Sequence, residues 1–451
     1  MTTGCYVRPL IPALAALALA GCATTYPLMP TPALYTGPQP RQLFTQAPAS
    51  VRTPPLDLLF ITDRAPATSA DELEPYTGDR SRAMAFGSTT ILFGEGLTWN
   101  ELVKQSLLVE RPSKTILTLG PTKELGRYPP IPYPLAATPA GMTRAPAVIE
   151  AHETATRELQ AEIVRRLSAS PRKEMVLYVH GVHNSFSDAA LTMGEMCHFL
   201  GREFVCAIFT WPAGGKRGIL FGYQGDYESS VFAGEHLRKA IRTIADTPGL
   251  ERIHILAHSR GTDVLATALS ALSNEAYMQR STLPQRFKLG HVVLLAPDLD
   301  IDVAPAKIFA ILSDPDLPFG AASNARAIIP PLRDFHLTIY VSPDDKALAA
   351  SSWLFGSLAR LGRVEASMLT PAQMEQVSQL GFLDVIQIRG TTDLFGHGYF
   401  HSNPKASADL IAMIRYGLKP NEPGRPLEEV KRPFWRVPSE GGTKRGDAEP
   451  D

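Results

Sequence analysis

The chain has 451 residues, 44% of them hydrophobic, which is enough for one large domain or two modest ones. Its formal net charge of −1 gives no sign of the basic surface that nucleic-acid binding requires, so we expect no nucleic-acid partner.

Residues 1–21 have the features of a secretory signal. The apolar run over residues 10–20 follows a basic residue and is shorter than the ~20 residues of a membrane-spanning helix. The ending LAGC (residues 19–22) resembles the lipobox of bacterial lipoproteins, in which the cysteine is lipidated. The resemblance implies a lipid anchor at Cys22 and a place in the cell envelope. Because Ala23 follows the cysteine, it favours the outer membrane, facing the periplasm.

The segments on either side of the central region have compositions that are unfavourable for a core. Residues 26–55 carry eight prolines and only two charges, so we assign residues 22–55 to a lipidated tether. Residues 428–451 are charged and without periodicity, and we expect a disordered tail there. Residues 56–427 are then the folded domain.

That domain alternates short apolar segments with amphipathic helical ones. The six expected core strands are residues 175–181, 205–211, 252–259, 291–298, 335–342 and 382–390, and the helices between them cover residues 187–201, 227–245 and 262–276. Near-continuous apolar strands indicate burial on both faces, as in a parallel sheet covered by helices. Residues 56–62 and 88–93 are expected to add edge strands. The pattern predicts an α/β fold with a mostly parallel central sheet.

Ser259 stands where an expected strand ends and a helix begins. Small residues, Ala257 and Gly261, lie two positions away on either side. This context is typical of a nucleophile elbow, a sharp turn that tolerates only small flanking residues and exposes the serine hydroxyl. The alternative is an ordinary serine that caps the helix.

A nucleophilic serine needs a base beside it and a carboxylate that orients the base. In this fold the chain order is serine, acid, histidine. Asp345 follows the strand over 335–342, and both His397 and His401 follow the strand over 382–390. All of these residues are expected at the same edge of the sheet as Ser259.

The acid has more than one candidate position. Asp298 follows the preceding strand, but it introduces a helix, where acids gain from capping and from the helix dipole. We therefore favour Asp345, with its neighbour Asp344 as a lesser alternative.

Several short pieces of the sequence together resemble a bacterial family of α/β-hydrolases catalogued as a domain of unknown function. They are ITDR (61–64), SRAMAFGS (81–88), YVHGVHNSFSDAA (178–190), FTWPAGG (209–215), GYQGDYESS (222–230), LAHSRGTDVL (256–265), LLAPDLDIDV (294–303), YVSPDDKAL (340–348) and FGHGYFHSNP (395–404). The resemblance implies an α/β-hydrolase fold with Ser259 as nucleophile, Asp345 as acid and His397 as base. Arg260 stands where an apolar residue is expected, which bears on the shape or charge of the acyl pocket.

The sequence HGVHN (180–184) resembles the His-Gly part of an oxyanion hole. The backbone N–H groups of Val182 and Arg260 are the expected donors, each contributing roughly 3 kcal/mol. Asn184 either assists or caps a turn. His180 and His183 have no third ligand at a sensible spacing, so we expect no metal and no cofactor.

Cys197 and Cys206 remain once the signal is removed. An exported chain oxidises such pairs, but their positions late in a helix and early in the next strand disfavour a disulfide. The long connection over residues 304–334 is expected to be a lid or binding loop over Ser259.

These features predict a membrane-anchored serine hydrolase that cleaves a small-molecule or lipid ester through an acyl-enzyme. The same residues would serve a thioesterase, an amidase or an acyltransferase. The competing interpretation is a tethered envelope protein whose hydrolase fold serves binding or assembly. Three filled positions of a triad count against that alternative.

Overall fold

In a computed structural model of the chain, the structure describes residues 25–69, 73–214, 218–310, 314–317, 335–355, 359–390 and 396–438. The expected signal, Cys22 and residues 439–451 lie outside this part. Most of the expected lid over 304–334 also lies outside it. No helix in the described ranges is long and apolar enough to cross a membrane.

Within the described residues, twelve strands form one sheet and two more form a separate hairpin. The sheet strands are β1 Tyr26–Pro27, β2 Leu56–Pro66, β3 Tyr76–Phe93, β4 Ile116–Arg127, β7 Glu174–Val179, β8 Val205–Thr210, β9 Arg252–His258, β10 Leu289–Leu295, β11 His336–Val341, β12 Leu383–Gln387, β13 Glu428–Lys431 and β14 Phe434–Arg436, and the hairpin strands are β5 Leu135–Thr138 and β6 Gly141–Arg144. All six expected core strands are present.

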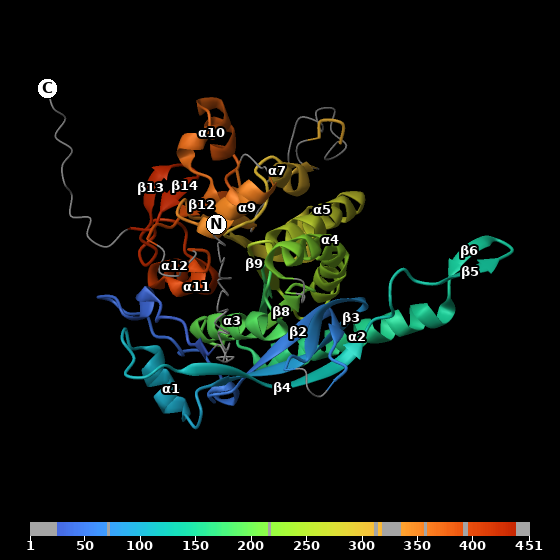
Figure 1. Ribbon diagram of the computed structural model, residues 1–451, viewed down its shortest axis with the longest axis horizontal. Helices are drawn as coiled ribbons and strands as arrows, with labels where there is room; N and C mark the ends of the chain where they lie inside the picture. Colours follow the sequence, from blue (N-terminus) through green and yellow to red (C-terminus); the bar gives the residue numbers. More distant parts are fainter. Residues whose placement is uncertain are drawn as a thin grey trace, which may run out of the picture.

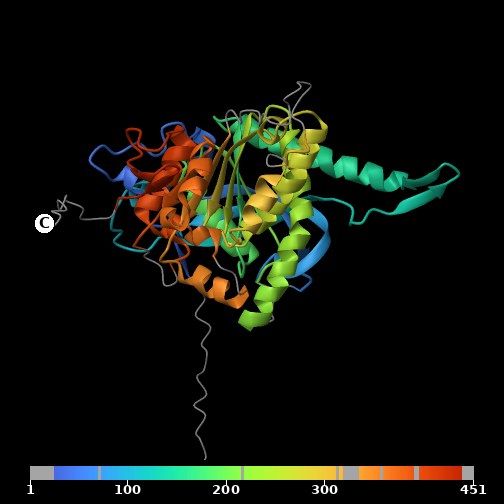
Figure 2. The ribbon, with the colours of Figure 1, turned by 90° about the horizontal axis from the view of Figure 1, so that it is seen from above.

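The α-helices follow in the expected alternation. They are α1 Trp99–Ser106, α2 Pro146–Ala169, α3 Phe186–Phe199, α4 Gly218–Ala245, α5 Gly261–Met278, α6 Leu283–Phe287, α7 Val303–Ile308, α9 Lys346–Phe355, α10 Pro371–Ser378, α11 Tyr399–Ser402 and α12 Pro404–Tyr416. Short 3₁₀ turns cover Ala33–Tyr35, Ala49–Val51, Leu361–Arg363 and Ala366–Met368. The β5–β6 hairpin and the start of α2 project from the body of the molecule (Figures 1 and 2).

The sheet is parallel through its centre and antiparallel at its ends. Its order is β1-β4-β3-β2-β8-β7-β9-β10-β11-β12-β14-β13. Neighbouring strands from β2 to β14 in this order pair in parallel. We expected β2 and β3 at an edge. Both lie inside the sheet instead, because β4 and β1 extend it beyond them.

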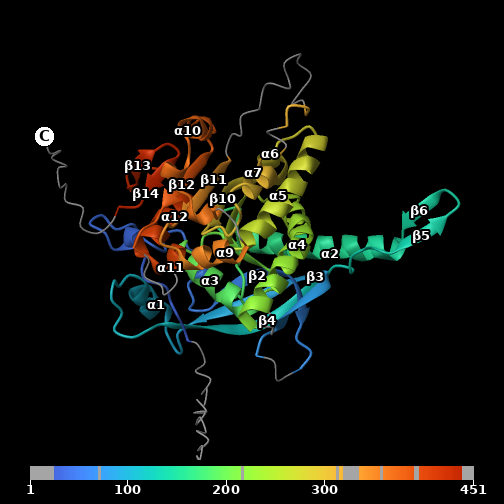
Figure 3. The same ribbon diagram turned by 45° about the horizontal axis from the view of Figure 1, so that its top comes forward.

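Helices cover both faces of the sheet, which explains the near-continuous apolar strands. In β7, Leu177 packs on the face covered by α2, α4 and α5, whereas Tyr178 packs on the face covered by α3 and α12. Figure 3 shows α4 and α5 on one side of the central strands and α11 and α12 on the other. Successive side chains of a strand point to opposite faces of the sheet. A strand that is covered on both faces therefore needs apolar residues at successive positions.

The proline-rich segment before β2 is folded, and our prediction of an extended tether is wrong for residues 25–55. Tyr26–Pro27 pairs with β4, and the side chains of Met29, Tyr35 and Leu43 are buried on the α3–α12 face. The Tyr35 hydroxyl donates to the carbonyl oxygen of Phe199 at 2.5 Å. A few apolar side chains, spread along this segment, are enough to bury it against the domain. The prediction failed because it considered the proline content and not these residues.

The predicted disordered tail also begins too early. Phe434–Arg436 forms β14, which pairs in parallel with β12, and β13 pairs with β14. Trp435 is buried, and its indole N–H donates to an Asp384 carboxylate oxygen at 2.8 Å. Two aromatic side chains, Phe434 and Trp435, thus extend the folded region to residue 438 in the described chain.

A disulfide joins Cys197 and Cys206, contrary to the expected distance between them. Cys197 lies in the last turn of α3 and Cys206 in β8, with their Cα atoms 6.1 Å apart. The short connection returns the chain beside the end of α3, because Gly201 adopts a positive φ of 83° there. The bridge therefore ties a helix on one face to the sheet.

We expect the Cys197→Ser/Cys206→Ser double variant to lose about 3 kcal/mol of unfolding free energy, because the disulfide restricts the unfolded chain. Urea denaturation without reductant measures this loss. Reductant should lower the stability of the unaltered protein and leave the double variant unchanged. Equal stability of the two proteins without reductant would contradict the prediction.

Candidate active site

Ser259 occupies a sharp turn between β9, which ends at His258, and α5, which begins at Gly261. Its φ of 53° lies in the left-handed region, which is strained for a serine and typical of functional turns. The turn is fixed from the neighbouring strand, because the Ser259 N–H donates to the carbonyl oxygen of Leu295 at 2.9 Å. The serine is 3% exposed.

Gly261 explains why the turn needs a small residue after the serine. A Cβ at this position would lie 2.3 Å from the carbonyl oxygen of His180, so α5 packs directly against the end of β7. β7 and β9 are neighbours in the sheet. The strand that follows β7 in the chain, β8, lies on one side of this pair, and the strand that follows β9, β10, lies on the opposite side. Ligands of open α/β sheets bind at such a reversal, beyond the carboxyl ends of the strands.

The loop after β7 lies against the serine. A Cβ on Gly181 would lie 2.8 Å from the Ser259 Cβ and 3.3 Å from its Oγ, so only glycine allows this approach. Val182, the next residue, is one of the two expected oxyanion donors, and Arg260 directly follows the serine. The structure thus brings both backbone segments to the hydroxyl.

Two side chains fix the conformation of this loop by accepting hydrogen bonds from backbone N–H groups. The Asn184 amide oxygen accepts the Gly181 N–H at 3.2 Å, so Asn184 caps the turn. Asp226 of α4 accepts the His183 N–H at 3.0 Å and the Gly214 N–H at 3.2 Å. Burial raises the pKa of Asp226, and these two backbone donors act in the opposite direction. Asp226, eight residues into α4, therefore has a structural role at this site.

His180 is buried in a network that fixes its tautomer. Its Nε2 accepts the Trp211 backbone N–H at 3.0 Å, so the proton resides on Nδ1, which donates to the Gly181 carbonyl oxygen at 2.7 Å. Burial and the positive charge of Arg64 hold the pKa of His180 well below its usual value. A neutral His180 with both nitrogens engaged is a support of the loop.

Arg64, at the end of β2, is the central support, and our sequence reasoning missed its role. Its guanidinium donates to the Asn184 carbonyl oxygen at 2.6 Å, to the Ala213 carbonyl oxygen at 3.0 Å and to the Thr210 hydroxyl at 2.8 Å. Burial lowers the pKa of Arg64 to about 10, which still leaves it charged at neutral pH. The available signal was an arginine shortly after the apolar run over residues 58–61 of β2.

We expect Arg64→Met to lower the unfolding free energy by about 4 kcal/mol, because buried carbonyl groups lose a charged donor. Arg80→Met is the matched control. Arg80 donates to Glu228 and Ser229 near the surface, and its loss should cost about 1 kcal/mol or less. Chemical denaturation of both variants measures the difference. Equal losses in the two variants would show that the buried network contributes little.

The candidate base and acid are in contact. His397 Nδ1 lies 2.7 Å from Asp345 Oδ2, with the His397 side chain 19% exposed and Asp345 fully buried. The second Asp345 oxygen accepts the Leu348 N–H at 2.9 Å, which fixes the carboxylate at the start of α9. β11 and β12 are parallel neighbours, so the segments after them meet at one edge of the sheet.

His258 connects this pair to the serine. Its Nε2–H donates to the His397 carbonyl oxygen at 3.2 Å, and the two imidazole rings are 4.7 Å apart. Burial, together with the nearby His397, holds the pKa of His258 well below its usual value. His258 is thus a neutral donor that supports the His397 loop.

Asp298, the alternative acid, lies in a different buried cluster. Arg260 donates to one of its oxygens at 2.8 Å, Ser351 donates to the other at 2.7 Å, and Arg360 lies 3.3 Å away. The Arg260 side chain is therefore directed to Asp298. His401, the alternative base, pairs with Glu195 at 2.8 Å. Among the described residues, no group of three or more His, Cys, Asp or Glu side chains is arranged to hold a metal ion.

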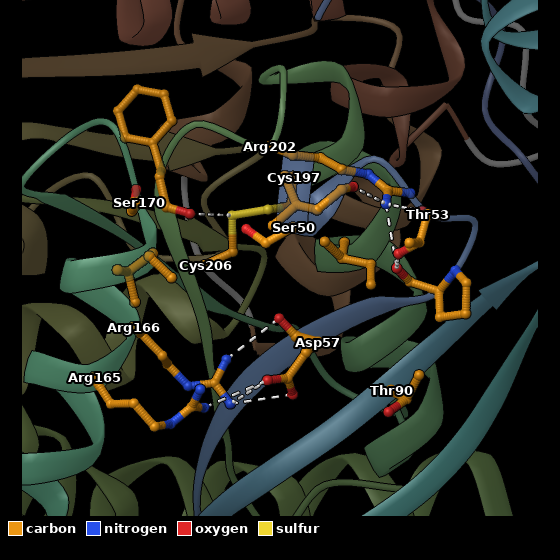
Figure 4. A pocket seen from close by; sticks show the side chains of 16 residues that line it. Ser50, Thr53, Asp57, Thr90, Arg165, Arg166, Ser170, Cys197, Arg202 and Cys206 are labelled. Atoms are coloured by element: carbon orange, nitrogen blue, oxygen red, sulfur yellow. Dashed lines mark hydrogen bonds and ion pairs between the residues drawn. A yellow bond between two sulfur atoms is a disulfide. The ribbon is translucent and has the colours of Figure 1, made fainter. Parts of the chain in front are cut away.

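A cavity of about 390 Å³ lies at the opposite edge of the sheet, at the start of β2 and β8 (Figure 4). The Cys197–Cys206 disulfide forms part of its wall. Arg166 donates to Asp57 and Glu162. Arg202 donates to the carbonyl oxygens of residues 51, 53, 54 and 55. Because these guanidinium groups are engaged within the protein, we assign the cavity no ligand.

The parallel sheet, the helices on both faces and a serine turn at the end of β9 define an α/β hydrolase. The family described as "alpha/beta hydrolase of unknown function (DUF900)" matches residues 155–414, more than half of the chain, and the chain belongs to this family. The resemblance identified from sequence is therefore confirmed. Among the curated proteins, no sequence matches the chain significantly.

Three solved structures of low identity are similar. An esterase from Pyrobaculum calidifontis is 11% identical, covering 58% of this chain and 91% of its own, with a TM-score of 0.28. Lipase B from Aspergillus fumigatus is 15% identical, covering 38% and 37%, with a TM-score of 0.21. Dipeptidyl peptidase 4 from Porphyromonas gingivalis is 12% identical, covering 68% and 38%, with a TM-score of 0.26.

Proposed function

We propose that this chain is a serine hydrolase that cleaves carboxylic esters through an acyl-enzyme. Ser259 is the nucleophile, His397 the general base and Asp345 the acid that orients it. The observation that carries the proposal is the 2.7 Å contact between His397 and Asp345, on a loop held against the strained Ser259 turn. A serine that merely caps a helix has no need of such a pair.

The reaction proceeds in two halves. The Ser259 Oγ attacks the ester carbonyl carbon while its proton passes to His397 Nε2, and the developing imidazolium is stabilised by Asp345. The tetrahedral oxyanion accepts hydrogen bonds from the backbone N–H groups of Val182 and Arg260. Collapse expels the alcohol, which takes the proton from His397. Water then attacks the acyl carbon while its proton passes to His397. Collapse breaks the bond to Ser259 Oγ, releases the acid and returns the proton from His397 to Oγ.

A panel of p-nitrophenyl esters of increasing acyl length tests the proposal, with matched thioesters and anilides beside it. We expect turnover of the esters that exceeds turnover of the anilides. A preference for thioesters or anilides would assign the same residues to a thioesterase or amidase. No turnover of any compound would favour the binding or assembly protein on a hydrolase fold.

We also propose that the protein is lipidated at Cys22 and attached to the outer membrane, facing the periplasm. The lipobox-like sequence LAGC after a short apolar run supports this, and so does the Cys197–Cys206 disulfide, because such bonds persist in exported proteins. A membrane ester is then an accessible substrate.

Cys22→Ser should abolish incorporation of labelled palmitate and move the protein from the membrane fraction to the soluble fraction. Cys5→Ser, which alters the signal outside the lipobox, is the control and should leave both properties unchanged. Palmitate incorporation that survives Cys22→Ser would contradict the anchor.

A further inference from the structure

A second histidine–carboxylate pair lies close to the candidate triad. His401 Nδ1 lies 2.8 Å from Glu195 Oε1, with the Glu195 side chain 1% exposed and His401 28% exposed. Glu195 comes from α3, and the proposed mechanism gives neither residue a task. A carboxylate buried to this degree is costly unless donors surround it, so the identity of its donors is informative.

The other donors to Glu195 come from the N-terminal segment. The Tyr26 hydroxyl lies 3.0 Å from Oε1, and the Met29 backbone N–H donates to Oε2 at 2.8 Å. Tyr26 also contacts the Thr192 hydroxyl, one turn earlier on α3, at 2.9 Å. One buried carboxylate therefore joins the first described residues of the chain to His401.

His401 is rigidly connected to the candidate base. Its backbone N–H donates to the Gly398 carbonyl oxygen at 3.2 Å, so residues 398–402 form a tight helical turn directly after His397. Phe400, within this turn, packs 5.0 Å from the His258 ring, and His258 donates to the His397 carbonyl oxygen. A displacement of His401 is thus transmitted to His397 over a short, packed path.

We propose that Glu195 is a positioning residue that holds the His397 loop through His401, and that Tyr26 and Met29 hold Glu195 in place. This inference rests on the proposed function, because it takes His397 as the base. It makes the segment that follows Cys22 part of the support of the active site.

A double-mutant cycle on ester turnover tests the connection. Glu195→Gln and His401→Ala should each lower kcat roughly 10- to 100-fold with KM little changed, because a small misplacement of a base affects the transition state. The double variant should be no slower than the slower single variant. If the fold-losses in kcat of the two single variants multiply in the double variant, the proposed path from Glu195 through His401 is overturned. If Glu195→Gln fails to fold, His401→Ala still tests the proposal, because His401 is partly exposed and its replacement leaves the core intact.

Two further variants complete the experiment. Tyr26→Phe removes one donor to Glu195 and should lower kcat in the same direction by a smaller factor. Tyr133→Phe is the matched control, because the Tyr133 hydroxyl bonds His152 and Lys239, which lie outside the Glu195 cluster. Unchanged kcat in Tyr26→Phe would overturn the role of the N-terminal segment.

A readout that needs no turnover separates this inference from the proposed function. The Nδ1 proton between His397 and Asp345 should give a downfield ¹H NMR signal, assigned by its loss in Asp345→Asn. We expect Glu195→Gln and His401→Ala to shift this signal and speed its exchange with water, and Tyr133→Phe to leave it unchanged. An unaltered signal in both variants would overturn the positioning role. If the unaltered protein turns over no substrate, the proposed hydrolase function is overturned. The NMR signal still decides whether Glu195 positions the His397 loop.

Discussion

Asp345→Asn should lower ester turnover by up to ~10⁴-fold while the protein remains folded, because an asparagine amide favours the wrong imidazole tautomer. The His397–Asp345 contact of 2.7 Å predicts that the loss falls on kcat. Steady-state kinetics with the best p-nitrophenyl ester, and a thermal unfolding curve of each variant, provide the measurement.

The neighbouring aspartates supply the controls for that experiment. Asp344→Asn, on an exposed side chain beside Asp345, should leave both turnover and stability unchanged. Asp298→Asn should cost roughly 3 kcal/mol of unfolding free energy, because Arg260 and Arg360 lose their shared buried carboxylate. A 10⁴-fold loss in Asp298→Asn with none in Asp345→Asn would assign the acid to the segment after β10.

The sheet could be predicted from sequence because its strands are buried on both faces. In β7 every side chain from Met175 to Val179 is buried, and the resulting apolar run is conspicuous in the sequence. The serine turn was equally visible, because Gly261 and a strand-to-helix change flank Ser259. Sequence reasoning therefore identified the elements that carry the candidate site.

The supports of the site could not be predicted in the same way. Arg64 and Glu195 are charged residues whose burial depends on partners more than a hundred residues away, such as the Asn184 carbonyl oxygen and the His401 ring. The N-terminal segment was misread because its prolines dominate its composition, whereas its fold depends on a few apolar contacts, such as that of Tyr35.

Ser259→Ala should abolish catalysis, with a loss of roughly 10⁶-fold in kcat, because no other group takes over covalent attack. The side chain is small and 3% exposed, so removal of one oxygen should leave stability nearly unchanged. Ser168→Ala, on the outward face of α2, is the matched serine control and should behave as the unaltered protein.

The most direct test of the central claim is intact-mass and peptide mass spectrometry after reaction with a fluorophosphonate. The account predicts one phosphonyl adduct per chain, on the peptide that contains Ser259, in the unaltered protein and in Ser168→Ala. It predicts no adduct in Ser259→Ala. Undiminished labelling of Ser259→Ala, or an adduct on a different residue of the unaltered protein, would contradict it.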